Sequence, residues 1–189
     1  MTKLGDLVVG RKNEITIMGI LNLSPESFYK NSIKSTKSQI SKYVTELEDN
    51  GANIIDIGGL STAPYLKTIV SEKIESERIT KTIKIIQSLS NIPISVDTCR
   101  ASVANDALEL GIDVINDISG LKYDKNMPKI IEKYQPSLIL CSYSKNIVKG
   151  NLISETKKLL NESIKIAQNS NIPKNKIVVD PAKIGRAHV

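Results

Sequence analysis

The sequence has few of the residues that stabilise disulfide-rich, metal-binding or nucleic-acid-binding domains. Its 189 residues include two cysteines, Cys99 and Cys141, one histidine and no tryptophan. This number and spacing of cysteines suits neither a disulfide framework nor a zinc site, so both are predicted to be small buried residues in a reduced compartment. Aromatic residues make up 4% of the chain, which leaves little to stack on nucleic-acid bases.

Long apolar runs are also missing from the sequence. None approaches the roughly 18 residues of a membrane span, and the N-terminus lacks the apolar centre of a signal peptide. We therefore expect a cytoplasmic protein that does not contact a membrane. The net charge is +6, but the lysines are scattered along predicted helices, which favours a solvated basic face over a nucleic-acid-binding surface.

What the sequence does contain is an alternation of strands and helices, clearest in the segment 92–121. One short apolar run there stops at Asp97, and a second stops at Asn116. Residues 101–110 between them are apolar at helical spacing and end at Gly111, which suits a helix C-terminus. A strand–helix–strand unit of this kind makes the two strands parallel neighbours. Asp97 and Asn116 should therefore point into the same space.

The alternation extends along the whole chain and predicts the fold class. Strands are predicted for 7–10, 15–21, 54–57, 94–96, 114–115, 137–141 and 177–179, and helices for 36–49, 71–89, 101–110, 127–134 and 153–170. The last six strands alternate with helices, and four of them end on Asn or Asp. This pattern favours a (β/α)8 TIM barrel, whose chemistry lies at the carboxyl ends of its strands. A doubly wound open sheet is the alternative, but no GxGxxG motif follows the first strand.

The length of the chain limits how much of a barrel it can form. A complete barrel takes about 250 residues, so about six of eight βα units fit here, in residues 1–182. The hexapeptide 184–189, IGRAHV, resembles a translated sequencing adapter. Residues 183–189 are therefore predicted to be a non-native tail, and His188 is given no role. We expect the chain as written to be unstable, because two strand edges stay unpaired. We also expect it to be inactive, for the separate reason that part of the site would lie beyond residue 182.

Five motifs, in this order along the chain, resemble the dihydropteroate synthases of the pterin-binding barrel family. They are Asn22-Leu-Ser-Pro-Glu-Ser-Phe28, Asp56-Ile-Gly-Gly-Leu-Ser-Thr62, Ser95-Val-Asp-Thr98, Ile115-Asn-Asp-Ile-Ser-Gly120 and Asp180-Pro181. The likeness extends from about Ile15 to Ala182. Around the second motif, Leu60, Ala63 and Tyr65 are closer to archaeal members of the family than to bacterial ones.

The resemblance implies a transferase of folate biosynthesis. Such an enzyme condenses a 6-hydroxymethyl-7,8-dihydropterin diphosphate with p-aminobenzoate or a related arylamine and releases pyrophosphate. The resemblance implies that Asp97, Asn116 and Asp180 bind the pterin ring, which suits the hydrogen-bond donors on the edge of that ring. It places Ser61 and Thr62 near the diphosphate and the arylamine.

The resemblance also implies a metal cofactor and an assembly. Asn22 corresponds to the family's contact with magnesium and diphosphate, so Mg²⁺ is the expected cofactor. At full length the protein is expected to be a homodimer. No residue is assigned as catalytic, because the family's basic residues on the seventh and eighth strands have no positions here.

Each candidate residue also has a structural interpretation. Asp97 could cap the helix that begins near 101, Asn116 and Asp117 could close a turn, and Asn22 could brace the loop that follows it. Asp117 is interpreted mainly as structural. For Asp56, which lies inside a predicted strand, lining a pocket and being buried with a hydrogen bond are both open.

Departures from the family leave two alternative functions. Ala63 stands where the family often has a loop arginine, with Lys67 as a candidate substitute, and Cys141-Ser142 replaces a Met-His-type string. One alternative is a pterin-dependent methyltransferase that acts through a corrinoid partner, although such proteins lack the NxSPxSF loop. The other is a non-catalytic pterin-binding subunit.

Overall fold

The computed structural model describes residues 1–10, 15–24, 36–60, 70–144 and 150–182. The chain begins with a hairpin of β1 (Thr2–Leu4) and β2 (Leu7–Val9), which pair antiparallel. Strands and helices then alternate as β3 (Met18–Asn22), α1 (Lys37–Asp49), β4 (Ile54–Gly58), α2 (Glu72–Gln87), β5 (Ile94–Asp97), α3 (Ala101–Glu109), β6 (Val114–Asp117), α4 (Met127–Tyr134), β7 (Ser137–Cys141), α5 (Leu152–Asn169), the 3-10 turn η2 (Lys174–Lys176) and β8 (Ile177–Asp180).

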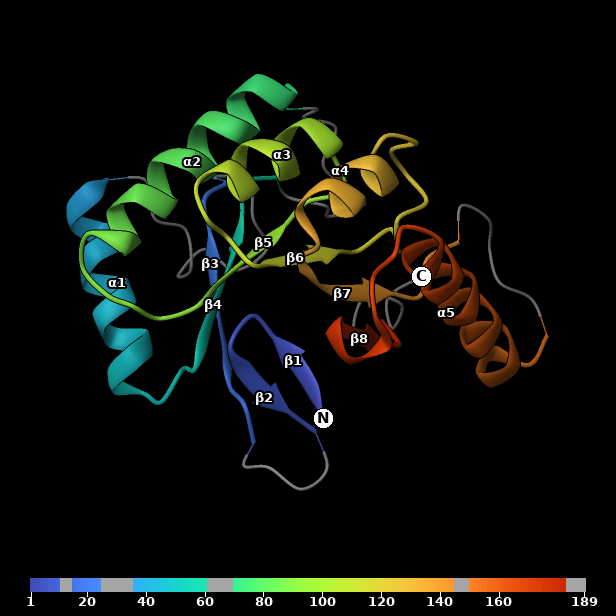
Figure 1. Cartoon of the computed structure of the whole chain (residues 1–189). Helices are drawn as coiled ribbons and strands as arrows, with labels where there is room; N and C mark the ends of the chain where they lie inside the picture. The colour runs from blue at the N-terminus through green and yellow to red at the C-terminus, as the bar shows by residue number, and fades with distance from the viewer. Residues whose placement is uncertain (11–14, 25–35, 61–69, 145–149, 183–189) are drawn as a thin grey trace.

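The strands β3 to β8 form one sheet in the order in which they occur along the chain. Each pairs with the next in parallel. Figure 1 shows the helices α1 to α5 in an arc around one side of the sheet, with the hairpin on the other side. This arrangement of six parallel strands that alternate with five helices among the described residues confirms the predicted incomplete barrel and excludes an open sheet wound in two directions.

The outer face of the sheet packs against the helices in the larger hydrophobic core. Every second residue of the strands contributes to it, including Leu21, Ile55, Ile57, Val96, Ile115, Leu138 and Leu140, all fully buried. Helix α2 adds Ile79, Ile83 and Ile86, as its spacing predicts. Ile74 and Leu89 were expected on the same face but are 45% and 51% exposed. They lie in the first turn and beyond the last helical residue, where the helix no longer lies against the sheet.

The inner face of the sheet carries a second, smaller apolar core at its N-terminal end. Leu4, Ile54, Val114 and Ile139 form a smaller core there, with Leu7, Val9, Met18 and Val178 packed against it. The hairpin contributes three of these side chains and donates a hydrogen bond from Gly5 N to Ser137 Oγ, 3.0 Å long. The N-terminal end of the inner face is therefore closed by apolar packing.

The two cysteines differ in their burial. Cys141 is buried as predicted, whereas Cys99 is only half-buried. Burial raises the pKa of Cys99 to about 12 and also raises the pKa of Cys141. Both thiols stay protonated at neutral pH, which makes them poor nucleophiles. In the described part of the chain, no helix combines the length and apolar character needed to cross a membrane.

Candidate functional site

A row of residues at the carboxyl ends of four strands begins the candidate site. Asn22, Gly58, Asp97 and Asn116 are register partners across β3, β4, β5 and β6. Register partners in parallel strands place their side chains on the same face of a sheet, here the inner one. A Cβ atom on Gly58 would lie 3.3 Å from Asn22 Oδ1 and 3.8 Å from Asp97 Oδ2. The glycine therefore leaves a space between these two oxygens.

A second polar layer lies two residues earlier on the same strands. Asp56 and Ser95 are register partners, and side chains two residues apart share a face. Asp56 is 6% exposed and Ser95 is fully buried. Asn116 Nδ2 donates a 2.9 Å hydrogen bond to Asp56 Oδ2, which joins the two layers. Asp56, for which the sequence left two interpretations, thus both faces the inside of the barrel and is hydrogen-bonded.

Unpaired polar atoms gather in this layer. In the described ranges, the buried side-chain atoms without a hydrogen-bond partner are Asp56 Oδ1, Ser95 Oγ and Asn116 Oδ1. Buried polar groups in proteins are almost always paired, because an unpaired one loses its hydration without compensation. Three such atoms on adjoining strands indicate a place where a ligand or an ordered water supplies the missing partners.

The electrostatics of the site also favour a hydrogen-bonding ligand. Burial raises the pKa of Asp56, and the neighbouring Ser95 hydroxyl and then the hydrogen bond from Asn116 act against this rise. The pKa of Asp97 is raised well above its usual value, first by burial and then by the negative charges of Asp56, Asp117 and Glu75. Two carboxyl groups are thus held where ionisation is unfavourable, and donors from a ligand would relieve this.

Asp180 lies at the same end of the sheet, on its outermost strand. It is the register partner of Cys141 in β7, whose thiol Sγ lies 3.5 Å from Asp180 Oδ2. The backbone N–H of Ala182 donates to Asp180 Oδ1 at 2.7 Å. Asp180 is exposed, because β8 has no further strand beside it among the described residues. It shares the inner face with Asp97 and Asn116 but lies at the edge of the site.

The predicted residues of the second loop cannot be placed. Ser61 and Thr62, with Ala63 and Lys67, lie outside the described residues. The assignment of Ser61 and Thr62 to diphosphate and arylamine therefore stays a prediction. The rest of the first motif, residues 25–28, also lies outside the described residues.

The structural roles considered for Asp97 and Asp117, a helix cap and a turn, have different outcomes. Asp97 does not cap helix α3, because the N–H of Ala101 donates instead to Asp124 Oδ2 at 2.9 Å. Asp117 does close a turn, since its Oδ1 accepts from both N and Oγ of Ser119 at 2.7 and 2.6 Å. Asp97 thus remains available to the inner face, whereas Asp117 holds the loop that follows β6.

The site presents two side-chain oxygen atoms beside the space at Gly58. Among the described residues, no group of three or more His, Cys, Asp or Glu side chains is arranged to hold a metal. Asn22 Oδ1 and Asp97 Oδ2 flank the space above Gly58. Oxygen donors in small number fit Mg²⁺, which keeps several waters and takes further ligands from substrate phosphates.

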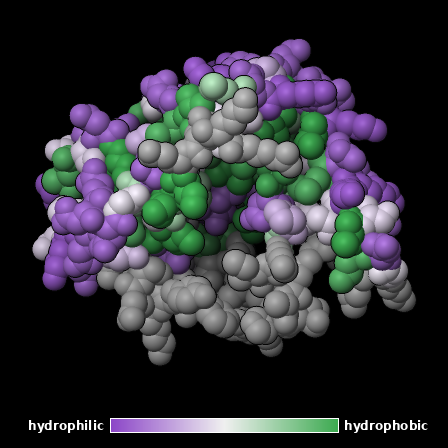
Figure 2. All heavy atoms as spheres, turned by 90° about the horizontal axis from the view of Figure 1, so that it is seen from below, coloured by the Kyte–Doolittle hydropathy of each residue, from purple (hydrophilic) through white to green (hydrophobic). Residues whose placement is uncertain are grey.

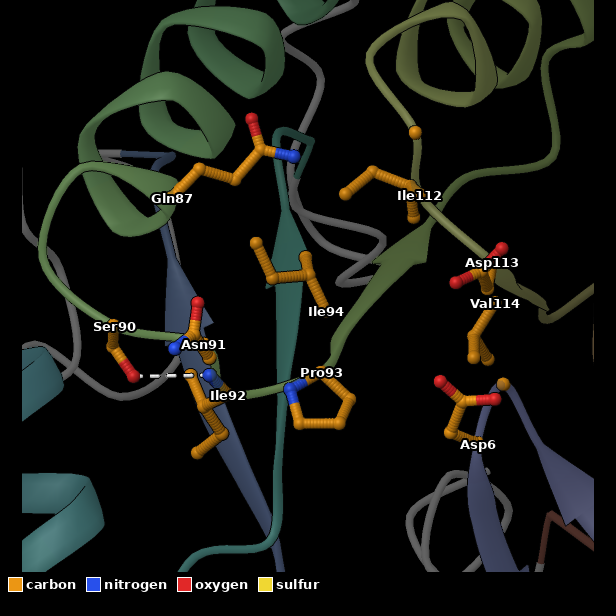
Figure 3. A pocket seen from close by; sticks show the side chains of 12 residues that line it. Asp6, Gln87, Ser90, Asn91, Ile92, Pro93, Ile94, Ile112, Asp113 and Val114 are labelled. Atoms are coloured by element: carbon orange, nitrogen blue, oxygen red, sulfur yellow. Dashed lines mark hydrogen bonds between the residues drawn. The ribbon is translucent and has the colours of Figure 1, made fainter.

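A separate hollow of about 260 Å³ lies at the opposite end of the sheet. Figure 3 shows Asp6 of the hairpin turn near Asp113 and Val114, with Ser90 and Gln87 on the other side. Two of its polar side chains are hydrogen-bonded within the protein: Ser90 Oγ accepts from Ile92 N at 3.0 Å, and Gln87 Nε2 donates to Leu110 O at 2.9 Å. None of the three unpaired buried atoms belongs to a residue that lines it, so it is not the candidate site.

The overall shape agrees with a site inside the curved sheet. Figure 2 shows the molecule from the side opposite α2 and α3, with a central recess between hydrophobic walls and hydrophilic atoms inside it. The recess suits a ligand that is apolar on its faces and polar along its edge.

Comparisons with known proteins give a consistent result. Residues 18–186 match the family described as pterin binding enzyme. A dihydropteroate synthase of Clostridium beijerinckii is 41% identical over 165 residues, which are 87% of this chain and 61% of that protein. The chain thus spans about three fifths of this curated relative.

Solved structures of similar proteins have the same fold. A dihydropteroate synthase from Clostridium difficile, crystallised in the presence of pteroic acid, has a TM-score of 0.78 and 35% identity over 88% of this chain and 63% of that chain. A dihydropteroate synthase from Coxiella burnetii in complex with pteroic acid has a TM-score of 0.81 and 30% identity, covering 93% and 62%. All three proteins are bacterial, and the archaeal likeness around Ala63 stays a prediction.

Proposed function

The chain belongs to the pterin-binding enzyme family, and from this premise we propose that the full-length protein is a dihydropteroate synthase. It would join a 6-hydroxymethyl-7,8-dihydropterin diphosphate to p-aminobenzoate or a related arylamine. The two similar structures obtained with pteroic acid support this choice, because pteroic acid contains a pterin joined to p-aminobenzoate. The cytoplasmic location and the homodimer that the resemblance implies are part of the same proposal.

The observation that carries the proposal is the set of unpaired buried atoms on the inner face. Asp56 Oδ1, Ser95 Oγ and Asn116 Oδ1 lack partners among the described residues, and the Asp97 carboxyl adjoins them. The aminopyrimidinone edge of a pterin carries N–H donors and a carbonyl acceptor in a row. Carboxyl groups can accept from these donors, and an amide or hydroxyl can do either. The ring and the site are therefore complementary in hydrogen bonding.

In the proposed reaction, the C–O bond between the pterin methylene and the diphosphate breaks, and a C–N bond to the arylamine forms. The amine loses a proton to solvent, and pyrophosphate leaves. Asp97 and Asn116 would hold the ring so that its methylene points toward the open carboxyl end of the strands. Asp180 would support the ring from the edge strand. Orientation of this kind lowers the barrier by removing the entropy of bringing two reactants together.

Mg²⁺ would be held beside Asn22, at the space that Gly58 leaves open. When bound, the cation offsets the negative charge that develops on the departing diphosphate. Asn22 contributes a neutral oxygen, so most of the ligands would come from phosphates and water.

The test is turnover by the full-length protein with the pterin diphosphate, p-aminobenzoate and Mg²⁺. We expect release of pyrophosphate that requires both organic substrates and formation of dihydropteroate in equal amount. Pterin binding without turnover would favour the non-catalytic subunit instead. Methyl transfer to an added corrinoid protein, without condensation, would favour the methyltransferase.

A further inference from the structure

A buried ion pair behind the candidate site joins the first turn of α2 to the residue that precedes α3. Arg100 Nη1 donates to Glu75 Oε2 at 2.7 Å, and the two residues are 7% and 1% exposed. The other oxygen of this carboxylate, Glu75 Oε1, accepts from Thr98 Oγ1 at 2.7 Å. A buried pair is stable only when both members are fully hydrogen-bonded, and both carboxylate oxygens meet that condition here.

Thr98 connects this ion pair to the site. It follows Asp97 directly, and neighbouring residues at a strand end point to opposite faces. Asp97 thus faces inward, while Thr98 faces α2 and bonds to Glu75. The backbone N–H of Thr98 also donates to the carbonyl of Asn116 at 3.1 Å. Glu75 is therefore hydrogen-bonded to the residue next to Asp97, while β6 also holds that residue through the carbonyl of Asn116.

The same ion pair also contacts Gly59 and Val70, which lie before and after segment 61–69 in the sequence. On one side, Val70 O accepts from Arg100 Nη1 at 2.9 Å. On the other, a Cβ atom on Gly59 would lie 3.0 Å from Glu75 Cγ, so the backbone of Gly59 lies directly against this side chain. Arg78 Nη1 adds a 3.1 Å hydrogen bond to Gly59 O.

We infer that Glu75 and Arg100 are positioning residues that fix Gly59 and Val70 relative to Asp97. This inference rests on the proposed function. The reaction needs the pterin, held at Asp97, to meet a second substrate, which the sequence assigns to the neighbourhood of Ser61 and Thr62. The ion pair would set the distance between the two substrates without touching either one.

The experiment replaces Arg100 in the full-length protein and separates binding from turnover. Arg100→Met removes the cation but keeps much of the side-chain volume. We expect the Kd for the pterin, measured by calorimetry, to change less than about threefold, because Asp97 and Asn116 remain. We expect kcat/KM for p-aminobenzoate to fall by at least about tenfold, since small misplacements of reactants cost up to about a hundredfold. Arg100→Lys, which can restore the ion pair, should recover most of the loss.

A matched control comes from a second ion pair. Lys122 lies on the loop after β6, and its Nζ contacts Glu162 Oε2 and Leu159 O of α5, both at 3.0 Å. Lys122→Met removes this cation. This variant should leave both pterin affinity and turnover unchanged. If Arg100→Met does not fold, Glu75→Gln replaces it, because one amide oxygen cannot accept from both Thr98 and Arg100 as the two carboxylate oxygens do.

The outcomes separate the inference from the function on which it rests. Wild-type protein without turnover would overturn the proposed function, and the inference with it. Active wild-type protein would overturn the inference alone in two cases. In one, Arg100→Met behaves like Lys122→Met; in the other, it loses pterin affinity as strongly as turnover.

Discussion

The two ends of the inner face of one sheet differ in how their side chains are paired. At the N-terminal end, Ile54, Val114 and Ile139 pack against the hairpin and are at most 8% exposed. At the C-terminal end, Asp56 and Asn116 share a hydrogen bond but each keeps an oxygen without a partner among the described residues. The first end contributes to stability. The second is arranged at the expense of stability, which is the usual property of a binding site.

The alternation of strand side chains explains how both ends can belong to the same strands. In β4, the inward positions are Ile54, Asp56 and Gly58. Along the strand, the side chain at these positions is first apolar, then polar, and at the glycine there is none. A single strand thus provides part of the hydrophobic plug, part of the polar layer and the open space beside Asn22.

The largest expected effect comes from breaking the apolar end. Ile54→Ala should lower the free energy of unfolding by about 2–5 kcal/mol, because a fully buried side chain is replaced by a cavity. Pterin affinity of the folded fraction should stay unchanged. Urea unfolding and calorimetric titration of the full-length protein measure the two quantities. Ile74→Ala, at a site that is 45% exposed, is the control and should cost much less. Loss of pterin affinity in Ile54→Ala would show that the two ends are not independent.

At the polar end, the largest effect is expected on binding. Asp97→Ala should weaken pterin binding by about 10- to 150-fold, because a hydrogen bond to a charged group is worth about 1.5–3 kcal/mol. Asn116→Ala should weaken it by about 2- to 12-fold for each neutral hydrogen bond that its amide makes to the ring, at about 0.5–1.5 kcal/mol each. Asp117→Asn should weaken it less, since Asp117 faces away and holds its own loop. Calorimetric titration of the folded variants decides this, and equal losses in all three would contradict the assignment.

Ser95→Ala should have a smaller effect on binding and the opposite effect on stability. A neutral hydrogen bond contributes about 0.5–1.5 kcal/mol, so pterin affinity should fall by about 2- to 12-fold. The hydroxyl has no partner among the described residues, so removing it should leave the free energy of unfolding unchanged or raise it. Thermal unfolding without ligand measures this, and a clear loss of stability would mean that Ser95 is already paired.

The smallest effect is expected in the pH dependence of stability. Burial raises the pKa of Asp97 above its usual 3.8. Between 3.8 and the raised value, the folded protein keeps a proton that the unfolded chain has released, so stability falls as the pH rises. Asp97→Asn should therefore flatten the decline of Tm from pH 4 upward. An identical pH profile for wild type and variant would show that the Asp97 carboxyl is not destabilised by burial.

The sequence predicted the elements of the fold well because their signals are local. Residues 127–134 and 137–141 form α4 and β7 within the predicted bounds, since apolar spacing and Pro128 in the first helical turn define them. Errors arose at element ends. Ile74 and Leu89 continue the apolar spacing of α2, but spacing alone does not say where the helix leaves the sheet.

The sequence predicted that the outer row of the candidate site would come together, but it left Asp56 of the deeper layer open and did not point to Ser95 as a site residue. Asn22 and Asp97 are the last residues of their strands and Asn116 is the last but one, and parallel pairing alone brings them together. Asp56 and Ser95 could have been found by counting back two residues from Gly58 and Asp97, which gives the same face. The Glu75–Arg100 ion pair had no such signal, because it joins residues 25 positions apart through tertiary packing.

The most direct test of the central claim is a crystal structure of the full-length protein soaked with pteroic acid. We predict density for the pterin ring on the inner face, with its donors within hydrogen-bonding distance of Asp97 and Asn116 and its edge toward Asp56 and Ser95. Density in the hollow beside Asp6 and Asp113 instead, or a ring that leaves Asp97 and Asn116 uncontacted, would contradict the assignment of the site to the carboxyl end of the sheet.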